Sequence, residues 1–222
     1  MNKTLRSIAV MLDGNRRWAK KNGFSVDEGH KVGLVDQVKK LVGWAVDAQV
    51  EHLVLFASSK NNLSRSKEEV SGLFAILSTG LFPLLKEFHQ EGITIHIVGA
   101  KEQFSPEVRE ELKEICVEAL NPKMHLWVCL WYSGRQDILE AARKVSSQVD
   151  EEAFGANLQT TGMPDIDLII RPGGEKRLSD FMLWQSAYSE LVFSDTLWPD
   201  FTEGDFKEAI AQFTSRDRRL GR

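Results

Sequence analysis

The sequence predicts an α/β protein with one domain, residues 1–222, in which a mostly parallel central sheet is covered by helices. Short aliphatic runs alternate along the chain with segments of helical periodicity, a pattern typical of strand–helix–strand units. Hydrophobic residues make up 42% of the chain, which is ample for a core. The sequence contains neither an internal repeat nor a low-complexity linker, so nothing in it indicates a domain boundary.

Six apolar runs are predicted to be strands, because each is short enough for a buried strand and is bounded by polar or turn-forming residues. They are residues 8–12, 53–57, 93–98, 124–131, 167–170 and 191–193. Side chains of the longest run should alternate between two faces of the sheet. The expected faces are Trp127, Cys129 and Trp131 on one side and Leu126, Val128 and Leu130 on the other.

Apolar residues at helical spacing predict the helices between these strands. The predicted helices are residues 29–48, 67–88, 106–120, 151–158 and 203–213. The second of them has Ser66 as N-cap and Glu69 at the third position, a capping box that favours a structural role for Glu69. The apolar stripe of this helix is either ordinary core, which is the default, or one wall of a hydrophobic tunnel.

Composition and charge argue against several classes of protein. A formal net charge of -4 and a pI near 5.8 are unlike those of a nucleic-acid binder with a broad basic surface. Cys116 and Cys129 lie far apart without metal-ligand spacing, so neither a disulfide framework nor a zinc site is expected. The apolar run after Arg6 is too short for a signal peptide or a membrane span. We therefore expect a cytoplasmic protein with at most peripheral membrane contact.

Residues 171–179, Arg-Pro-Gly-Gly-Glu-Lys-Arg-Leu-Ser, directly follow the predicted strand 167–170. Gly173 and Gly174 allow the backbone to approach an anion and to point N–H groups at it. Further donors are the side chains of Arg171, Lys176, Arg177 and Ser179. The pattern is typical of a phosphate cradle, and a solvated Gly-rich surface loop is the structural alternative.

A second polar cluster, residues 13–18, follows the first predicted strand. The Asp13 carboxylate can hold a divalent cation, and Gly14 lets backbone amides approach a phosphate. Arg16 and Arg17 add positive charge at the same place. The structural alternative is that Asp13 or Asn15 caps a helix.

Other polar residues lie near strand ends, although each alone is weak. His30 at the start of a helix is more typical of a capping or solvated residue than of a ligand. Glu190, just before the last strand, is more typical of an exposed edge charge. Because the carboxyl ends of parallel strands meet at one edge of a sheet, the polar loops that follow at least four strands are expected to converge there.

Together these motifs resemble the cis-prenyltransferases over almost the whole chain. The residues that carry the resemblance are Asp13-Gly14-Asn15-Arg16-Arg17-Trp18-Ala19, Gly29-His30, Ser59, Asn62, Arg65, Glu69-Val70, residues 167–184, Ala187-Tyr188, Glu190-Leu191, Leu197-Trp198-Pro199-Asp200-Phe201, Arg219 and Gly221. This ordered set is highly specific. It identifies residues 1–222 as a single cis-prenyltransferase-like catalytic domain.

The resemblance implies a homodimeric, Mg²⁺-dependent enzyme that joins an allylic diphosphate to isopentenyl diphosphate with Z geometry. It implies Asp13 and Glu190 as metal-binding residues. The implied catalytic residues are Asp13, Asn15, His30, Ser59 and Asn62. The implied substrate-binding residues are Gly14, Arg16, Arg17, Trp18, Arg65, Glu69, Arg171, Arg177, Ser179, Arg219 and Gly221, with Arg219 and Gly221 reaching over from the partner subunit. An apolar helix beside this site would form a hydrophobic tunnel next to the diphosphates.

Four positions depart from the family pattern. Val26 replaces an Arg shortly before Gly-His, and Leu63 replaces an aromatic residue. Trp131 replaces an Asn, and Trp127 of the same strand is bulkier than usual for the family. Extra bulk beside the tunnel or the substrate gap predicts a short- to medium-chain product.

Two alternatives stay open at this stage. The changed residues are also similar to a branch of the family that makes irregular, lavandulyl-type products by joining two allylic diphosphates head to middle. The other alternative is a non-catalytic subunit of a hetero-oligomeric enzyme. Such subunits lose the metal-binding Asp, so the presence of Asp13 favours an active enzyme.

Overall fold

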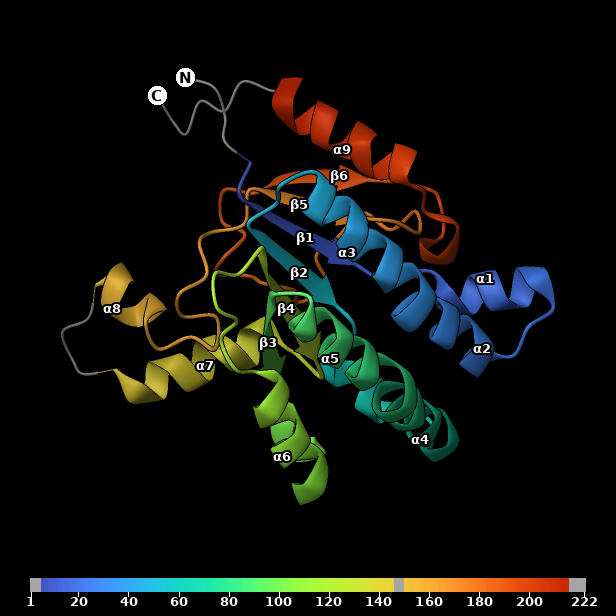
Figure 1. Ribbon diagram of the computed structural model, residues 1–222, viewed down its shortest axis with the longest axis horizontal. Helices are drawn as coiled ribbons and strands as arrows, with labels where there is room; N and C mark the ends of the chain where they lie inside the picture. The colour runs from blue at the N-terminus through green and yellow to red at the C-terminus, as the bar shows by residue number, and fades with distance from the viewer. Residues whose placement is uncertain (1–4, 146–149, 216–222) are drawn as a thin grey trace.

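The computed structural model describes residues 5–145 and 150–215, and its centre is one six-stranded sheet (Figure 1). The strand order is β3-β4-β2-β1-β5-β6, and every neighbouring pair is parallel. The strands are β1 Ser7–Met11, β2 His52–Phe56, β3 Ile93–Gly99, β4 Met124–Leu130, β5 Leu168–Arg171 and β6 Glu190–Phe193. The predicted α/β class and all six predicted strands are confirmed.

Helices connect the first five strands in succession, as the alternating pattern predicts, whereas irregular chain joins β5 to β6 and the last helix follows β6. The helices are α1 Asn15–Asn22, α2 Val26–Lys31, α3 Gln37–Asp47, α4 Lys67–Ile76, α5 Phe82–Gln90, α6 Pro106–Ile115, α7 Gly134–Lys144, α8 Glu151–Gly155 and α9 Glu203–Ser215. The π-helical turns Val32–Asp36 and Leu77–Leu81 join α2 to α3 and α4 to α5. In Figure 1, α1 and α2 lie together at one end of the molecule and α7 and α8 at the other.

Several helix ends differ from the prediction, and α8, for example, ends at Gly155 instead of position 158. α2 begins at Val26 instead of position 29, because Ser25 and Glu28 form a capping box one turn earlier. α6 ends at Ile115 instead of position 120.

The two faces of the sheet carry separate hydrophobic clusters. On one face, Ile8, Leu53 and Leu126 pack against the long helices α3, α4 and α5 and against α9. On the other face, Ala9, Val54 and Trp127 pack mainly against irregular chain around residues 163–182. The first face therefore holds the larger core.

The apolar stripe of the α4–α5 helix belongs to this larger core. Leu73, Leu77, Leu81 and Leu85 are all buried in it, as ordinary core residues are, and Leu73 also lines the cavity beyond the sheet. Residues Lys67–Gln90 are long and apolar enough to cross a membrane by length and composition alone. Core helices pass the same test, and this one packs against the sheet.

The predicted face of Trp131 is wrong. The residue follows β4 and has a φ of 51°, a left-handed conformation that turns its side chain to the opposite face from Trp127. Trp131 lies in the α4-side cluster, with its ring centroid 5.0 Å from that of Phe74. Trp127 stays on the other face, stacked on His96 at 3.8 Å between centroids, so its bulk does not reach the α4 side.

The backbone at the last residue of β3 predicts that only glycine fits this position. Gly99 has a φ of 114°, and a Cβ there would lie 2.0 Å from the carbonyl oxygen of Leu130. We expect Gly99→Ala to destabilise the protein by roughly 3 kcal/mol or more, through left-handed strain and backbone overlap. Gly43→Ala is the matched control, since nothing lies within 4 Å of a Cβ at this helical position. Urea unfolding should show a gain of about 1 kcal/mol for the control, and equal stability of the two variants would contradict the requirement for glycine at position 99.

Candidate active site

One cavity of about 860 Å³ lies beyond the carboxyl ends of β1, β2 and β5. Its walls come from the segments that the sequence singled out, which are 11–30, 56–73 and 171–179. Asp13 and Arg177 both line it, although 164 positions separate them in the chain. The predicted convergence of polar loops at one edge of the sheet is therefore confirmed for the loops that follow these three strands, whereas Ser133 after β4 lines a separate, smaller cavity.

Two glycines shape the first and last of these segments, and one of them allows the segments to touch. Gly14 caps α1 at its amino end with a φ of 114°. Gly173 has a φ of 95°, and a Cβ there would lie 2.9 Å from both the Asp13 carbonyl oxygen and Nη2 of Arg17. Any larger residue at position 173 would therefore separate the two loops.

The N–H groups of the Gly-Gly pair are not directed at a ligand, which corrects one sequence expectation. Gly173 donates to the carbonyl of Thr196 at 2.8 Å, and Gly174 donates to that of Ser194 at 2.8 Å. These glycines serve the tight turn and the close approach of Asp13 instead. Backbone donors for an anion come from the first turn of α1, whose N-cap makes no side-chain hydrogen bond.

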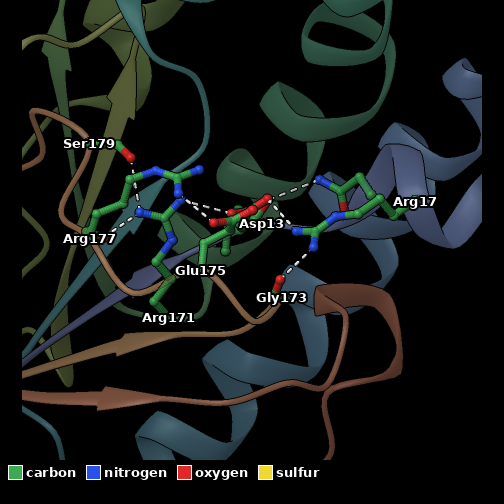
Figure 2. Close-up of polar contacts among 9 residues, drawn as sticks. Asp13, Arg17, Arg171, Gly173, Glu175, Arg177 and Ser179 are labelled. Carbon is green, nitrogen blue, oxygen red and sulfur yellow. Dashed lines mark hydrogen bonds and ion pairs between the residues drawn. The ribbon is translucent and has the colours of Figure 1, made fainter.

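Asp13 joins the two loops by ion pairs to two arginines. Its Oδ2 accepts from Nη2 of Arg171 at 2.9 Å, and its Oδ1 accepts from Nη2 of Arg17 at 3.2 Å. Figure 2 shows Asp13 between these two guanidinium groups. Nη1 of Arg17 also donates to the carbonyl of Gly173 at 2.6 Å. The side chain of Arg17 thus links the Asp13 carboxylate to the backbone of the second loop.

Arg171 organises the rest of the predicted phosphate loop. Only 5% of its side chain is exposed. Its Nη1 donates to Oγ of Ser179 at 2.9 Å and to the carbonyl of Arg177. The guanidinium of Arg177 itself is exposed and pairs with Glu175 (Figure 2). Arg171 therefore shapes the loop from within, and Arg177 is the accessible cation.

A second cationic group lies across the cavity on other elements. The Glu69 carboxylate accepts from Arg65 at 2.7 Å and lies 3.6 Å from Nη1 of Arg16. Ser66 is the N-cap of α4 as predicted, with its Oγ accepting from the Glu69 N–H at 3.3 Å. The reciprocal half of the predicted capping box is absent from the described residues, because the Glu69 carboxylate is directed at the arginines instead. Glu69 therefore positions the two cations.

His30 and Asn15 line the same cavity, and His30 lies close enough to Arg65 and Arg16 to feel their charge. His30 is 7% exposed, and its Nε2 has no partner among the described residues. Burial, and secondarily the charge of Arg65, lower the pKa of His30 to about 4, so its imidazole is neutral near pH 7. Asn15 donates to the carbonyl of Leu12 at 3.1 Å, and Gly33 provides room for its buried amide.

Ser59 and Asn62 line the cavity from the short turn Lys60–Ser64. Oδ1 of Asn62 accepts from the Ser59 N–H at 2.8 Å, which fixes the Asn62 amide. Both predicted residues are thus placed in the same cavity as His30.

Two predicted assignments do not fit this cavity, and two predicted residues lie outside the described part of the chain. Trp18 stacks on Phe24 and donates to Asp200 at 2.6 Å, so its indole holds the loop after β6 rather than lining the cavity. Glu190 pairs with Leu168 at the amino ends of β6 and β5, opposite to the end that holds Asp13. A metal site shared by Glu190 and Asp13 of one chain is therefore wrong. The expected roles of residues 219 and 221 lie outside the described residues.

Sequence reasoning missed Lys20, which lines the cavity one helical turn after Arg16. The signal was present in the spacing, because positions i and i+4 of a helix share one face. Val26, which replaces an Arg of the family, lines the same cavity with the exposed ring of Phe24. Lys20 therefore supplies positive charge to a cavity that lacks the usual Arg.

The donor set suits Mg²⁺ held jointly with a substrate. No group of three or more His, Cys, Asp or Glu side chains that could hold a metal occurs within residues 5–145 and 150–215. One carboxylate, Asp13, lines the cavity and has 31% of its side chain exposed. Mg²⁺ commonly binds through one or two carboxylates together with substrate phosphates, and Asp13 fits that arrangement.

A match to a protein family identifies the kind of protein that contains this cavity. The family described as putative undecaprenyl diphosphate synthase matches residues 11–221. The chain belongs to this family. An isoprenyl transferase of Chlorobaculum tepidum is 40% identical over 98% of this prenyltransferase and 86% of its own length. A ditrans,polycis-undecaprenyl-diphosphate synthase ((2E,6E)-farnesyl-diphosphate specific) of Salmonella typhimurium is 37% identical, over 97% and 90% of the two chains.

Solved structures agree on the fold of the prenyltransferase. Lavandulyl diphosphate synthase from Lavandula x intermedia, in complex with dimethylallyl diphosphate, has a TM-score of 0.88 and 33% identity over 97% of each chain. A probable undecaprenyl diphosphate synthase from Campylobacter jejuni has a TM-score of 0.81 and 29% identity, over 99% of this chain and all of the other. Prenyl-transfer enzymes of both product types therefore share this architecture.

Burial of His30 predicts a pH dependence of stability. Its folded pKa of about 4 lies below the ordinary 6.5, so the unfolded chain binds this proton first as the pH falls. Stability from this group is complete above about pH 6.5 and is lost between about pH 6.5 and 4. We expect the fall in unfolding free energy from pH 7 to pH 4.5 to be about 2 kcal/mol smaller in His30→Gln. Urea unfolding at both pH values tests this, and an equal fall in both proteins would contradict it.

Lys20 predicts a difference between two adjacent lysines. Lys20 lines the cavity, whereas Lys21 on the next helical position does not. We expect Lys20→Ala to weaken binding of inorganic pyrophosphate about tenfold, because a charged donor is lost. Lys21→Ala, which removes the same charge, should leave the Kd within about twofold since distant surface charges are screened. Isothermal titration calorimetry measures both constants, and equal losses would show that only net charge matters.

Proposed function

We propose that this prenyltransferase condenses an allylic diphosphate with isopentenyl diphosphate and forms a Z double bond with the help of Mg²⁺. The observation that carries the proposal is the Asp13–Arg171 ion pair, which places two cationic groups in one cavity. Two anionic headgroups and their reacting carbons can then lie side by side. Positioning of this kind accounts for a large part of catalysis in two-substrate reactions.

Each cationic group suits one diphosphate. The α1 amino end with Gly14, Arg16, Lys20 and Arg65 receives the allylic diphosphate. Arg177 and Ser179 receive the homoallylic diphosphate on a loop held by Arg171. Arg17 connects the loop after β1 to the loop after β5 through its contacts with Asp13 and Gly173.

The residues in the cavity support a stepwise reaction. The allylic C–O bond breaks and its electron pair leaves with pyrophosphate, whose growing charge is stabilised by the arginines. The π electrons of isopentenyl diphosphate then form the new C–C bond, and loss of a C2 proton restores a double bond. Neutral His30 has a free ring nitrogen among the described residues and is available to take this proton. Asn15, Ser59 and Asn62 line the same space.

Mg²⁺ would be held by Asp13 together with phosphate oxygens, and when bound it neutralises charge on the leaving pyrophosphate. Asp13 must then share its oxygens between the metal and the two arginines. The exposed part of this carboxylate is turned to the cavity that the substrates enter.

The irregular, head-to-middle reaction is the second candidate. It is favoured by Val26, which leaves the allylic side of the cavity more apolar, and by similarity to the lavandulyl enzyme. The intact Asp13 and the Gly174-Glu175-Lys176-Arg177 run favour the head-to-tail reaction. A non-catalytic role is a third candidate, and the assembled Asp13–Arg171 site argues against it.

We propose a homodimer in the cytoplasm, with at most peripheral membrane contact. The family resemblance of the chain's end, in which residues 219 and 221 complete a partner's site, supports the dimer. Sedimentation velocity of the purified protein tests the oligomeric state.

The proposed reaction is tested by incubating purified protein with labelled isopentenyl diphosphate, Mg²⁺ and allylic primers of several lengths. We expect incorporation that requires a primer and is abolished by EDTA. Asp13→Asn should lower kcat at least about a hundredfold, because Mg²⁺ and Arg171 both lose a charged partner. Asp47→Asn, at the exposed end of α3, is the matched control and should retain full activity.

Other outcomes separate the candidates. Product formation from dimethylallyl diphosphate as sole substrate would support the irregular reaction. Absence of turnover with every primer, combined with activation of a co-expressed homologue, would support the non-catalytic role and reject the proposal.

A further inference from the structure

The side chain of Trp131 fills the α4 side of the sheet next to the diphosphate cavity. We infer that Trp131 ends the space available to the growing prenyl chain and thereby sets a short product length. This inference rests on the proposed function, since it concerns where the product of that reaction can extend.

The backbone around Trp131 is fixed to the loop that lines the cavity. The Trp131 N–H donates to Oγ of Ser58 at 2.9 Å. Tyr132 exchanges hydrogen bonds with this loop, donating to the Ser58 carbonyl at 3.1 Å and accepting from the Lys60 N–H at 2.9 Å. Because Ser58 lines the diphosphate cavity, Trp131 is held one residue away from the substrate region.

Trp131 forms an aromatic plug with two rings, Phe74 of α4 and Phe104. The centroids of Trp131 and Phe74 are 5.0 Å apart, those of Trp131 and Phe104 are 6.5 Å apart, and those of Phe74 and Phe104 are 5.4 Å apart. Leu73, the residue before Phe74, lines the cavity itself. The plug therefore begins immediately behind the apolar wall of the diphosphate site.

The route past the plug is where a prenyl tail would have to go. Each condensation adds one isoprene unit at the diphosphate end, so the older part of the chain moves away from the headgroup. The tail must stay away from water, and the α4 face of the sheet is the larger apolar layer beside the cavity. The smaller cavity of about 150 Å³ beside Trp131 and Leu63 is lined mostly by polar side chains, so it does not offer the tail another route.

Two energetically unfavourable features of Trp131 argue for a role beyond packing. Its φ of 51° is unfavourable for a bulky residue. Its Nε1 is buried without a hydrogen-bond partner among the described residues, in a side chain that is 1% exposed. Strain and unpaired polar atoms of this kind gather at functional sites.

Trp127 supplies a natural comparison on the same strand. Its Nε1 donates to Nδ1 of His52 at 3.2 Å, and its ring stacks on His96. It lies on the face away from α4 and is as deeply buried as Trp131. If bulk anywhere in β4 limited the product, both tryptophans would matter equally. The geometry assigns the effect to Trp131 alone.

The test compares Trp131→Leu with Trp127→Leu. Each variant receives the same allylic primer and an excess of isopentenyl diphosphate, and mass spectrometry of the dephosphorylated products gives the chain lengths. We expect the major product of Trp131→Leu to be longer than that of the wild type by one or more isoprene units. Trp127→Leu should keep the wild-type length. Phe74→Leu, which opens the plug from the α4 side, should also lengthen the product and decides the matter if Trp131→Leu does not fold.

Each remaining outcome overturns the inference in a distinguishable way. Unchanged lengths in the folded, active plug variants, or equal lengthening by Trp127→Leu, would reject the inference and leave the proposed function standing. A wild-type product of around eleven units would likewise reject it, because the plug would then not limit growth. Failure of the wild type to incorporate isopentenyl diphosphate with any primer would reject the proposed function as well.

Discussion

The ion pair between Asp13 and Arg171 is the constraint on which the site depends. It joins loops that follow β1 and β5, two adjacent strands whose ends are separated by most of the chain. The contact needs glycine at position 173, because the backbone of Asp13 occupies the space where a side chain would lie. A buried guanidinium without its counter-ion is costly, so the loops are stable in this arrangement only together. The same contact that closes the fold at this edge therefore builds the cavity.

The charged side chains around the cavity hold one another in place and are also available to a ligand. Asp13, Glu69 and Glu175 each hold arginines in place, and two of these carboxylates contact two arginines each. Arginines that are already positioned in this way need little reorganisation when charge develops on a leaving group. A loss of Glu69 would therefore act on catalysis through the orientation of Arg65 and Arg16, without any contact of its own to substrate.

Sequence periodicity was sufficient for the strands, because short aliphatic runs bounded by turns leave few alternatives in a parallel sheet. Convergence of the polar loops followed from topology, which places the ends of β1, β2 and β5 together. Single side chains were harder to place. The left-handed φ of Trp131 reverses its face, and no alternation rule carries that information. Glu190 lies at the amino end of β6, whereas the cavity lies at the carboxyl ends of the strands. The indole of Trp18 donates to Asp200 and therefore does not line the cavity.

The charge of the cavity also supports the proposed use of a metal in addition to arginine. Six cationic side chains line it, namely Arg16, Arg17, Lys20, Arg65, Arg171 and Arg177. Five of them already contact one of three carboxylates, so their charge is partly neutralised before any substrate binds. Two diphosphates bring more negative charge than the remainder can balance, although the cavity is strongly positive for a chain with a net charge of -4. In the proposed reaction, a divalent cation held by Asp13 and substrate phosphates would make up the difference and stabilise the departing pyrophosphate.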